Sequence, residues 1–306
     1  MMKTKLIVVA GPTAGGKTGL GVELAKALGG EIISADSMQI YKDMGIATAA
    51  PTQEERAQAP HHLVEFLDRE TSFSVSDFCA LAKEAVEDIT GRGRLPIIVG
   101  GTGLFIDSFV DNIKFTQIET DLALRERLME KDTEELYTEL ISIDPNAAEK
   151  IHKNNKIRVV RALEIYYASG KTKSDQEVAS RLEESPYEVL YFVIGYKNRD
   201  ILYDRINRRV DIMLQNGLLD EAKRCLEVAG RTSAQAIGHK ELKPYLDGEI
   251  SLEEAVDNLK KETRHYAKRQ LTWFKKRENA VWLYADEDSD IVSTAISKSR
   301  EFLKNG

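Results

Sequence analysis

Hydrophobic residues gather in five short continuous runs, which are separated by mixed or amphipathic sequence. The runs are rich in β-branched and aromatic residues, which is typical of parallel strands covered on both faces. They predict buried strands at Leu6–Ala10, Glu31–Ala35, Leu95–Gly100, Val189–Gly195 and Ala280–Tyr284.

Between these runs, apolar residues recur at the spacing of amphipathic helices. Helices are predicted at Thr18–Leu28, Val75–Ile89, Arg199–Asn216, Leu218–Ala229 and Leu252–Lys276, with a longer helical interval from about Leu122 to Arg181. Alternation of strands and helices predicts an α/β fold built on a parallel sheet. The long interval exceeds the needs of one crossover. We therefore expect an all-helical insertion at 112–188 between two parts of the core, 1–111 and 189–306, the second of which contains basic helices.

The composition is that of a globular chain. The 306 residues are 42% hydrophobic and include 20 glycines and 7 prolines, which excludes low-complexity disorder. No apolar run approaches the roughly 20 residues of a membrane helix, and the first strand leads into a glycine loop, not a cleavage site. We expect a cytoplasmic protein with no membrane contact, no obligate protein partner, and reduced thiols at Cys79 and Cys225.

Charge is unevenly distributed along the chain. The formal net charge is −7, but the section from Lys150 to Arg277 holds 26 Lys and Arg against 19 Asp and Glu, a local net charge of +7. Such a section can hold a polyanion on one face, because phosphate binding depends on local Lys and Arg. Solvated helix faces give the same pattern, so charge alone leaves both interpretations open.

The strongest motif is a phosphate loop between the first predicted strand and the first predicted helix. Its residues are Gly11, Pro12, Thr13, Ala14, Gly15, Gly16, Lys17 and Thr18, which fit G-x-x-x-x-G-K-[ST]. Glycines let successive backbone N–H groups face one concavity, and the helix N-terminus adds partial positive charge. Lys17 can reach terminal phosphates, and the Thr18 hydroxyl can ligate Mg²⁺. The motif predicts a di- or triphosphate site with Mg²⁺ as cofactor.

An acidic residue that nucleotide hydrolysis needs is missing from its expected place. Such enzymes carry it at the end of a neighbouring strand, where it holds Mg²⁺ and water. The third predicted strand ends instead in Gly100-Gly101-Thr102-Gly103, and no Asn-Lys-x-Asp segment for guanine follows the fourth strand. These absences favour a loop that holds a departing diphosphate over one that presents a γ-phosphate for cleavage.

The second predicted strand delivers Asp36 to the carboxyl edge of the sheet, where α/β proteins bind ligands. Asp36 could ligate Mg²⁺, act as a general base or cap the next turn, and the pattern leaves these roles open. Three residues on, Gln39 carries an amide that suits an adenine edge.

Several segments together resemble the tRNA dimethylallyltransferase (tRNA isopentenyltransferase) family in its bacterial form. They are GPTAGGKT, SADSMQIYKDM, APHHLVE, VGGTGLF, IRVVRALEIY, AIGHKEL and RHYAKRQLTWF, in this order from about Leu6 to Phe274. The phosphate loop alone is not specific, whereas the DSMQIYK and AKRQLTWF segments together are. Adenylate isopentenyltransferases share the first half.

The resemblance implies a P-loop NTPase-like parallel core with an all-helical insertion that grips the anticodon stem-loop of tRNA. It also implies transfer of a dimethylallyl group from dimethylallyl diphosphate to the N6 amine of the adenosine just 3′ of the anticodon. Asp36 matches the residue that takes the amine proton, and Thr102 matches a position that contacts the reacting groups. Arg209 best matches an arginine aimed at the diphosphate, with Arg205 the second choice. For these arginines and Arg208, a solvated helix face is the alternative.

The resemblance further implies contacts with tRNA. The matching residues are Asp36, Ser37, Met38, Gln39, Arg125, Ile157, Arg158, Arg161, Gln235, Gly238, His239 and Lys240. The target base must leave its stack to enter a pocket. Tyr266, Trp273 and Phe274 alternate with Lys and Arg, which could form a stacking surface on RNA or could simply pack a helix.

Some residues depart from the family pattern or invite other interpretations. Ala47, Ala50 and His239 stand where the family usually has Gly, Lys and Tyr, which bears on contacts with the anticodon loop. His61 and His62 have no third metal ligand at suitable spacing, so packing or hydrogen bonding is expected there. The alternatives in function are a small-molecule P-loop kinase, an RNA-binding ATPase and an adenylate isopentenyltransferase. The basic section favours an RNA acceptor over free AMP.

Overall fold

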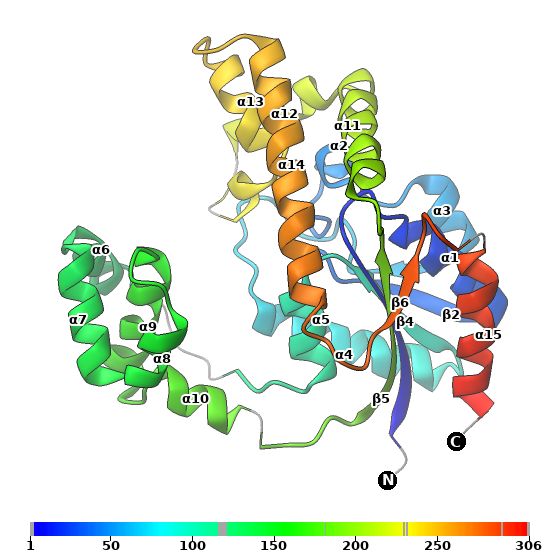
Figure 1. Ribbon diagram of the computed structural model, residues 1–306, viewed down its shortest axis with the longest axis horizontal. Coiled ribbons are helices and arrows are strands. Elements are labelled where there is room, and N and C mark those ends of the chain that lie inside the picture. Colours follow the sequence, from blue (N-terminus) through cyan, green and yellow to red (C-terminus); the bar gives the residue numbers. More distant parts are fainter. Residues whose placement is uncertain are drawn as a thin grey trace. The chain divides into compact units, whose positions relative to one another are not determined.

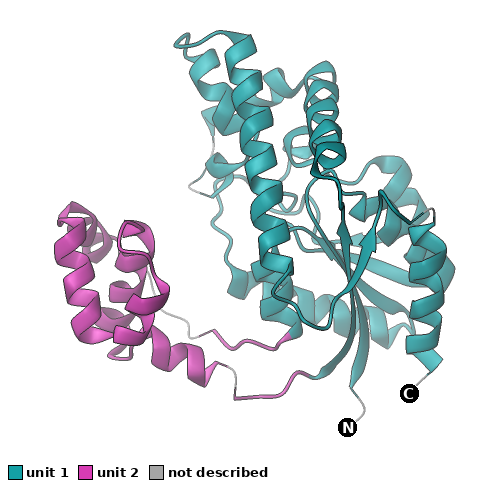
Figure 2. Cartoon of the chain, viewed as in Figure 1, with its two compact units in different colours: residues 1–110, 186–306 teal, residues 111–185 magenta. Residues whose placement is uncertain are grey.

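The protein, in a computed structural model, is described at residues 3–115, 121–180, 182–228, 230, 232–288 and 290–304. It divides into two compact units, one of residues 1–110 and 186–306 and the other of residues 111–185 (Figure 2). The insertion was expected at 112–188, and the second unit spans nearly the same residues, 111–185.

The first unit is built on a parallel sheet of six strands in the order β3-β2-β4-β1-β5-β6. The strands are β1 (Thr4–Ala10), β2 (Gly30–Ser34), β3 (His61–His62), β4 (Leu95–Gly100), β5 (Tyr187–Gly195) and β6 (Val281–Tyr284). Central β1 pairs with two strands, so that Ile7 lies opposite Ile97 of β4 and Leu190 of β5. The predicted α/β class and all five predicted strands are confirmed. The two-residue edge strand β3 was not predicted.

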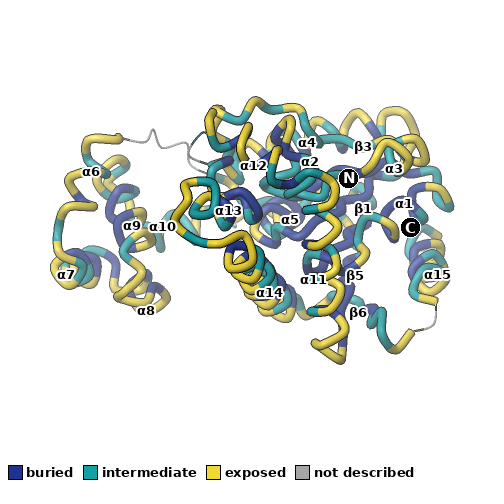
Figure 3. The backbone as a smooth tube through the Cα atoms, turned by 90° about the horizontal axis from the view of Figure 1, so that it is seen from above, coloured by how far each residue is buried: buried dark blue, intermediate teal, exposed yellow. Residues whose placement is uncertain are grey.

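Helices cover both faces of the sheet (Figure 1). One face packs against α1 (Lys17–Leu28) and α15 (Ile291–Lys304), and the other against α4 (Val75–Gly91) and α5 (Gly103–Val110). Alternate residues of β1 enter the two cores, with Ile7 on the first face and Leu6 on the second. In Figure 3 the tube is dark blue along the buried strands and turns yellow on the outer sides of the helices.

The remaining helices of the first unit lie around the carboxyl ends of the strands. They are α2 (Gly45–Thr48), α3 (Gln53–Gln58), α11 (Arg199–Gln215), α12 (Leu218–Glu227), the 3₁₀ turn Ser233–Gln235, α13 (His239–Leu246) and α14 (Leu252–Phe274). Helices α2, α3, α5, α13 and α15 were not predicted. Residues 235–240, which the family resemblance places against tRNA, run from the end of the 3₁₀ turn to the start of α13. The predicted helix ends at Ala229 and Arg181 lie outside the described residues.

The second unit is all helical. It contains α6 (Leu122–Glu130), α7 (Thr133–Ile143), α8 (Pro145–Lys150), α9 (Lys156–Ser169) and α10 (Lys173–Ala179). Each helix begins at an Asp, Asn or Thr whose side chain accepts a backbone N–H of the first turn. Leu136, Leu140, Val159 and Leu163 form its own core. In the described part of either unit, no helix is long and apolar enough to cross a membrane.

Candidate active site

A cavity of about 640 Å³ opens at the carboxyl ends of β1 and β2. Its walls come from the phosphate loop, the turn after β2, α2, α11, the segment before α13, and α14, all in the first unit. The size is that of a small-molecule site. The cavity brings together Lys17, Asp36 and Arg209, which lie in three distant parts of the sequence.

The phosphate loop wraps around the carbonyl oxygen of Pro12. The Gly15 amide donates to this oxygen at 3.1 Å, and Lys17 Nζ donates to it at 2.7 Å. Gly16, the N-cap of α1, has φ of 94°, a backbone conformation that favours glycine. Thr18, in the first turn of α1, also lines the cavity. The loop therefore presents the first turn of α1 to the cavity, as an anion site requires.

The charge of Arg209 perturbs Lys17 across the cavity. Burial, then the charge of Arg209, lowers the pKa of Lys17 from 10.5 to about 8, while Asp36 acts in the opposite direction. Burial also lowers the pKa of Arg209, which Asp36 and Glu55 oppose. The charge of Arg209 thus destabilises the charged form of Lys17, and an anionic ligand beside both cations would relieve this.

Asp36 follows β2 and is half-buried at the cavity wall. Its Oδ1 accepts hydrogen bonds from the backbone amides of Met38 at 2.9 Å and Gln39 at 3.3 Å. Within the described residues, Oδ2 has no hydrogen-bond partner. One oxygen thus caps the turn, which holds the carboxylate in place, and the other is left to face a ligand.

Thr102 lies directly behind this turn. Its Oγ1 accepts the backbone amide of Ser37 at 3.1 Å, and its own amide donates to the Ala35 carbonyl at 3.2 Å. Burial and the charge of Asp36 raise the pKa of Tyr266, while hydrogen bonds to Thr102 and Gln270 act the other way. Thr102 therefore connects the Asp36 turn with the Tyr266 phenol of α14.

Gln270 of α14 joins the two glycine-rich loops, and sequence reasoning did not single it out. Its Oε1 accepts the Thr13 amide at 2.8 Å, and its Nε2 donates to the Gly101 carbonyl at 2.9 Å. A Cβ on Gly101 would lie 2.2 Å from that Nε2, and one on Gly103 would lie 2.3 Å from the Trp273 ring. The glycines after β4 are thus needed because α14 packs directly on them.

Two other aromatic residues of α14 differ in burial, since Trp273 is 37% exposed whereas Phe274 is packed in the core. Phe274 is fully buried in the core, and Trp273 Nε1 donates to Asp107 at 2.6 Å. Tyr266 alone of the three lines the cavity.

The arginines of α11 differ in their surroundings. Arg205 donates from Nε to the carbonyl of Ala14 in the phosphate loop at 3.0 Å, and its guanidinium lies 5.9 Å from the Tyr196 ring centre. Arg209, one turn on, is half-buried at the cavity. Arg208 is exposed and pairs with Asp204 at 3.5 Å, so the solvated-face alternative describes Arg208.

The residues expected to hold the adenine are partly occupied by protein partners. Gln39 Nε2 donates to the carbonyls of Thr48 and Ala49 at 3.2 and 3.1 Å, and its Oε1 accepts Ser34 Oγ at 3.0 Å. Gln39 thus fastens α2 to the end of β2.

Among the expected anticodon contacts of the first unit, Gln235 and Gly238 line the cavity. His239 is only 1% exposed, and its Nε2 lies 2.9 Å from Glu221 Oε1. Lys240 is exposed in the first turn of α13.

In the second unit, the expected tRNA residues lie on α9 and α6. Ile157, Arg158 and Arg161 are exposed on α9. Arg161 also pairs with the buried Glu164 at 3.3 Å, as does Arg125, whose side chain is only 19% exposed. Arg125 therefore compensates the negative charge of the buried Glu164 carboxylate.

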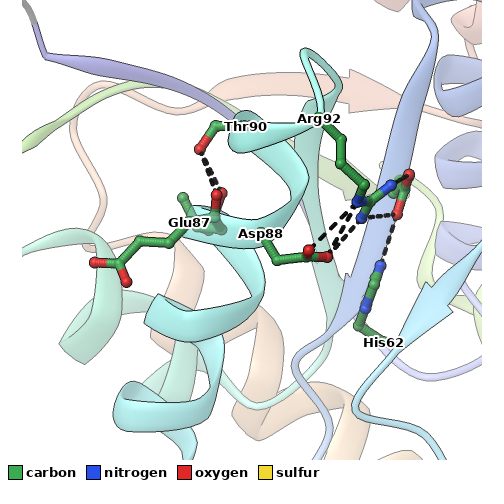
Figure 4. Close-up of polar contacts among 7 residues, drawn as sticks. His62, Glu87, Asp88, Thr90 and Arg92 are labelled. Atoms are coloured by element: carbon green, nitrogen blue, oxygen red, sulfur yellow. Dashed lines mark hydrogen bonds and ion pairs between the residues drawn. The ribbon is translucent and has the colours of Figure 1, made fainter.

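The His61-His62 pair belongs to a separate cluster near the amino end of β2. His62 Nε2 lies 2.8 Å from Glu31, and Arg92 contacts both Glu31 and Asp88 (Figure 4). The bonds from Arg92, followed by those from His62, lower the pKa of buried Glu31 to about 2 against a desolvation cost. His62 thus makes a hydrogen bond to Glu31, in line with the expectation of packing or hydrogen bonding at this pair.

Comparisons with known proteins agree with the family resemblance of the sequence motifs. The sequence model described as IPP transferase matches residues 39–277, and the one described as isopentenyl transferase matches residues 2–75. A tRNA dimethylallyltransferase from Caldanaerobacter subterraneus is 45% identical over 94% of this chain and 93% of that protein. The chain belongs to the tRNA dimethylallyltransferase family. A tRNA dimethylallyltransferase from Halalkalibacterium halodurans is 47% identical over 94% of each protein.

Solved structures of tRNA dimethylallyltransferases share the fold. A tRNA isopentenylpyrophosphate transferase from Bacillus halodurans is 44% identical, with a TM-score of 0.72 over 99% of this chain and 96% of that one. A eukaryotic dimethylallyltransferase acting on tRNA is 31% identical, with a TM-score of 0.85 over 99% and 80%. As a tRNA dimethylallyltransferase the chain is a prenyltransferase, and the kinase, ATPase and adenylate isopentenyltransferase alternatives are not favoured.

Proposed function

We propose that this enzyme transfers the dimethylallyl group of dimethylallyl diphosphate to the N6 amine of the adenosine just 3′ of the anticodon in tRNA. The observation that carries this proposal is one cavity with two opposite chemistries. Lys17, Arg209 and the phosphate loop offer positive charge, and Asp36 Oδ2 offers a proton acceptor. A transfer that releases an anion and a proton needs both.

The donor's allylic C–O bond breaks with its electron pair leaving on the diphosphate. Backbone amides at the start of α1, together with Lys17 and Arg209, stabilise the negative charge that gathers there. Burial lowers the pKa of both cations, and the charge of Arg209 lowers the pKa of Lys17 further, so the charged forms are favoured most when the diphosphate is present.

The adenine N6 lone pair forms the new C–N bond, and the amine loses one proton to Asp36. The exocyclic amine is a weak nucleophile, since its lone pair is delocalised into the ring, so a carboxylate within hydrogen-bond reach assists by orienting it. The amides of Met38 and Gln39 fix the Asp36 carboxylate through Oδ1, which leaves Oδ2 for this role. Thr102 holds the Ser37 amide and so steadies the same turn.

Mg²⁺ fits the oxygen donors at this cavity. Thr18, which carries a hydroxyl, and Asp36, which carries a carboxylate, both line it, and no group of three His, Cys, Asp or Glu side chains in the described residues could hold a metal without substrate. That donor set suits an ion that is bound mainly by water and substrate phosphates. When bound, Mg²⁺ supplies further positive charge to the diphosphate.

The tRNA anticodon stem-loop would be recognised by both units. The exposed Ile157, Arg158 and Arg161 of α9 suit the RNA backbone, and Gln235, Gly238 and Lys240 lie at or beside the cavity that receives the flipped base. Gln39 would meet the adenine only after exchanging bonds that it now makes to α2.

The test is incubation with unmodified tRNA, Mg²⁺ and dimethylallyl diphosphate labelled in the allyl group, with AMP and ATP as competing acceptors. We expect label on tRNA at the adenosine next to the anticodon. Label on AMP in the presence of tRNA would support an adenylate isopentenyltransferase. Steady hydrolysis of ATP without label on any acceptor would contradict prenyl transfer.

A further inference from the structure

Glu221 of α12 has no role in the chemistry above, yet its carboxylate is buried at 3% exposure and fully bonded. Oε2 accepts the backbone amide of Ile46 at 2.8 Å, and Oε1 accepts that of Ala47 at 2.8 Å. His239 Nε2 lies 2.9 Å from Oε1. Because backbone amides donate to both oxygens, the carboxylate acts as an acceptor throughout, and His239 Nε2 carries the proton.

These bonds hold α2 in place from outside. The helix has only four residues, and its own N-cap, Met44, supplies no side-chain bond. So short a helix is not stable by itself, and its first amides need acceptors. Glu221 supplies them from α12, which packs against both α2 and α13. Gly238, just before α13, approaches so closely that a Cβ there would lie 3.1 Å from Ala47 Cβ.

From α2 the contacts continue to the proposed base. The carbonyls of Thr48 and Ala49 accept Gln39 Nε2 at 3.2 and 3.1 Å. The Gln39 backbone amide in turn donates to Asp36 Oδ1 at 3.3 Å. A continuous path of hydrogen bonds and one short helix therefore runs from His239 to Asp36. Two segments that this path joins, 47–50 and 235–238, line the cavity.

We propose that Glu221 is a positioning residue for the acceptor: through α2 and Gln39 it sets the Asp36 turn, and through His239 it couples that turn to the segment 235–240. RNA bound against that segment would thereby meet a correctly placed Asp36. The phosphate loop is not part of this path, so donor binding is independent of it. The inference rests on the proposed function, in which Asp36 receives the amine proton.

The first experiment compares Glu221→Gln with Glu227→Gln, which makes the same chemical change at an exposed site of the same helix. A glutamine at 221 keeps one acceptor oxygen and turns an NH₂ donor toward a backbone N–H. We expect Glu221→Gln to slow single-turnover transfer at saturating tRNA by about 10–100-fold, as misplacement of a reacting group does, and to raise the KM for tRNA. The Kd for dimethylallyl diphosphate should equal that of Glu227→Gln. An equal loss of donor affinity and turnover would show general structural damage and overturn the inference.

Two further variants test the contribution of His239. His239→Gln keeps a side-chain N–H near Glu221, whereas His239→Phe removes it from a site of similar volume. Recovery of turnover and of the KM for tRNA in His239→Gln relative to His239→Phe is expected. Equal values for both variants would remove His239 from the path.

A double-mutant cycle with Asp36→Asn separates this inference from the proposed function. If Glu221 acts through Asp36, Glu221→Gln should cost much less turnover in the Asp36→Asn background than in the wild type. A full additional loss there would overturn the inference and leave the proposed function standing. A neutral Asp36→Asn would remove Asp36 from the role of base, and with it this inference, while transfer to tRNA would still be measured.

Discussion

Gln270 and Thr13 are 257 residues apart, yet the Gln270 side-chain oxygen accepts a 2.8 Å hydrogen bond from the Thr13 amide. The other end of the same amide group donates to the Gly101 carbonyl. One buried side chain of α14 thus fixes the phosphate loop to the turn after β4. The placement of the donor site therefore depends on a segment close to the end of the chain.

Gly101→Ala tests this arrangement, because its Cβ would lie 2.2 Å from Gln270 Nε2 and force that amide out of both bonds. We expect a loss of about 1–3 kcal/mol in the free energy of unfolding and weaker binding of dimethylallyl diphosphate. The control is Gly91→Ala at the end of α4, where a Cβ meets nothing within 4 Å. Chemical denaturation and calorimetric titration measure both variants, and equal values for the two would contradict the role of Gln270.

Glu31 gives a stability prediction with a defined pH window. Its pKa is lowered from 4.5 to about 2 in the folded protein, mainly by Arg92 and also by His62. The stabilisation is thus fully present above about pH 4.5 and is lost as pH falls toward about 2. Because Arg92 is partly exposed, we expect Glu31→Gln to cost about 1–3 kcal/mol at neutral pH, less than the whole shift implies.

Urea denaturation from pH 7 down to pH 3 measures this difference. The gap between wild type and Glu31→Gln should narrow below about pH 4.5. Glu87→Gln, at an exposed residue of α4 that is also drawn in Figure 4, is the control and should change stability by less than about 0.5 kcal/mol. A gap that stays constant down to pH 3 would contradict the assignment.

Lys17 should make the affinity for dimethylallyl diphosphate change with pH in the alkaline range. Its pKa of about 8 means that it loses its charge above that pH in the ligand-free protein, whereas a bound diphosphate favours the charged form. Affinity for dimethylallyl diphosphate should therefore fall above about pH 8, by up to about tenfold per pH unit. Titrations from pH 7 to 9.5 without tRNA measure it, and a constant Kd would contradict the prediction.

Arg209→Met is the informative companion variant. Arg209 lowers the pKa of Lys17, so its removal should move the alkaline midpoint upward while weakening donor binding at every pH. A midpoint unchanged in Arg209→Met would show that the two cations are not coupled.

The strands and the phosphate loop could be predicted because their signals are local. A continuous apolar run such as Leu6–Ala10 or a G-x-x-x-x-G-K-[ST] loop is complete within a few residues. The strand His61–His62 and the helix Gly45–Thr48 have no such signal, since two polar residues or a single turn carry no periodicity. Their conformations come from neighbours, β2 for the strand and Glu221 for the helix.

The supporting residues of the site could not be predicted, because their partners are remote. Gln270 contacts Thr13 and Glu221 contacts Ala47, each across more than 150 residues of sequence. No spacing rule reaches that far, and a buried polar residue in a helix looks like a surface one until the fold is known. For Phe274 the pattern left stacking and packing open, and its full burial decides for packing.

Arg158 provides a test of RNA binding in the second unit. It is exposed on α9, and within the described residues it has no ion pair. We expect Arg158→Ala to weaken tRNA binding several-fold and to reduce the slope of log K against log salt by about 1, with about twice that for Arg158→Ala combined with Arg161→Ala. Arg127→Ala, an exposed arginine of α6, is the control. Equal slopes for Arg127→Ala and Arg158→Ala would argue against a specific phosphate contact.

Asp36 is the proposed proton acceptor, and its three candidate roles predict different results. As general base, Asp36→Ala and Asp36→Asn should each lower single-turnover transfer by about 10²–10⁴-fold while both substrates still bind. As a Mg²⁺ ligand alone, its loss should be repaired by excess metal. As a cap of the Met38–Gln39 turn alone, its loss should cost about 0.5–2 kcal/mol of stability with turnover nearly intact.

The two substitutions separate these roles because they treat the cap differently. Asn can still accept the Met38 and Gln39 amides through its side-chain oxygen, so Asp36→Asn keeps the turn and removes only the proton acceptor at Oδ2. Asp36→Ala loses both. Rates measured at saturating tRNA and donor across Mg²⁺ concentrations should therefore be similarly low for the two variants, with Asp36→Asn the more stable. Near-wild-type turnover of Asp36→Asn at saturating metal would remove Asp36 from the role of base and leave the turn as its only function.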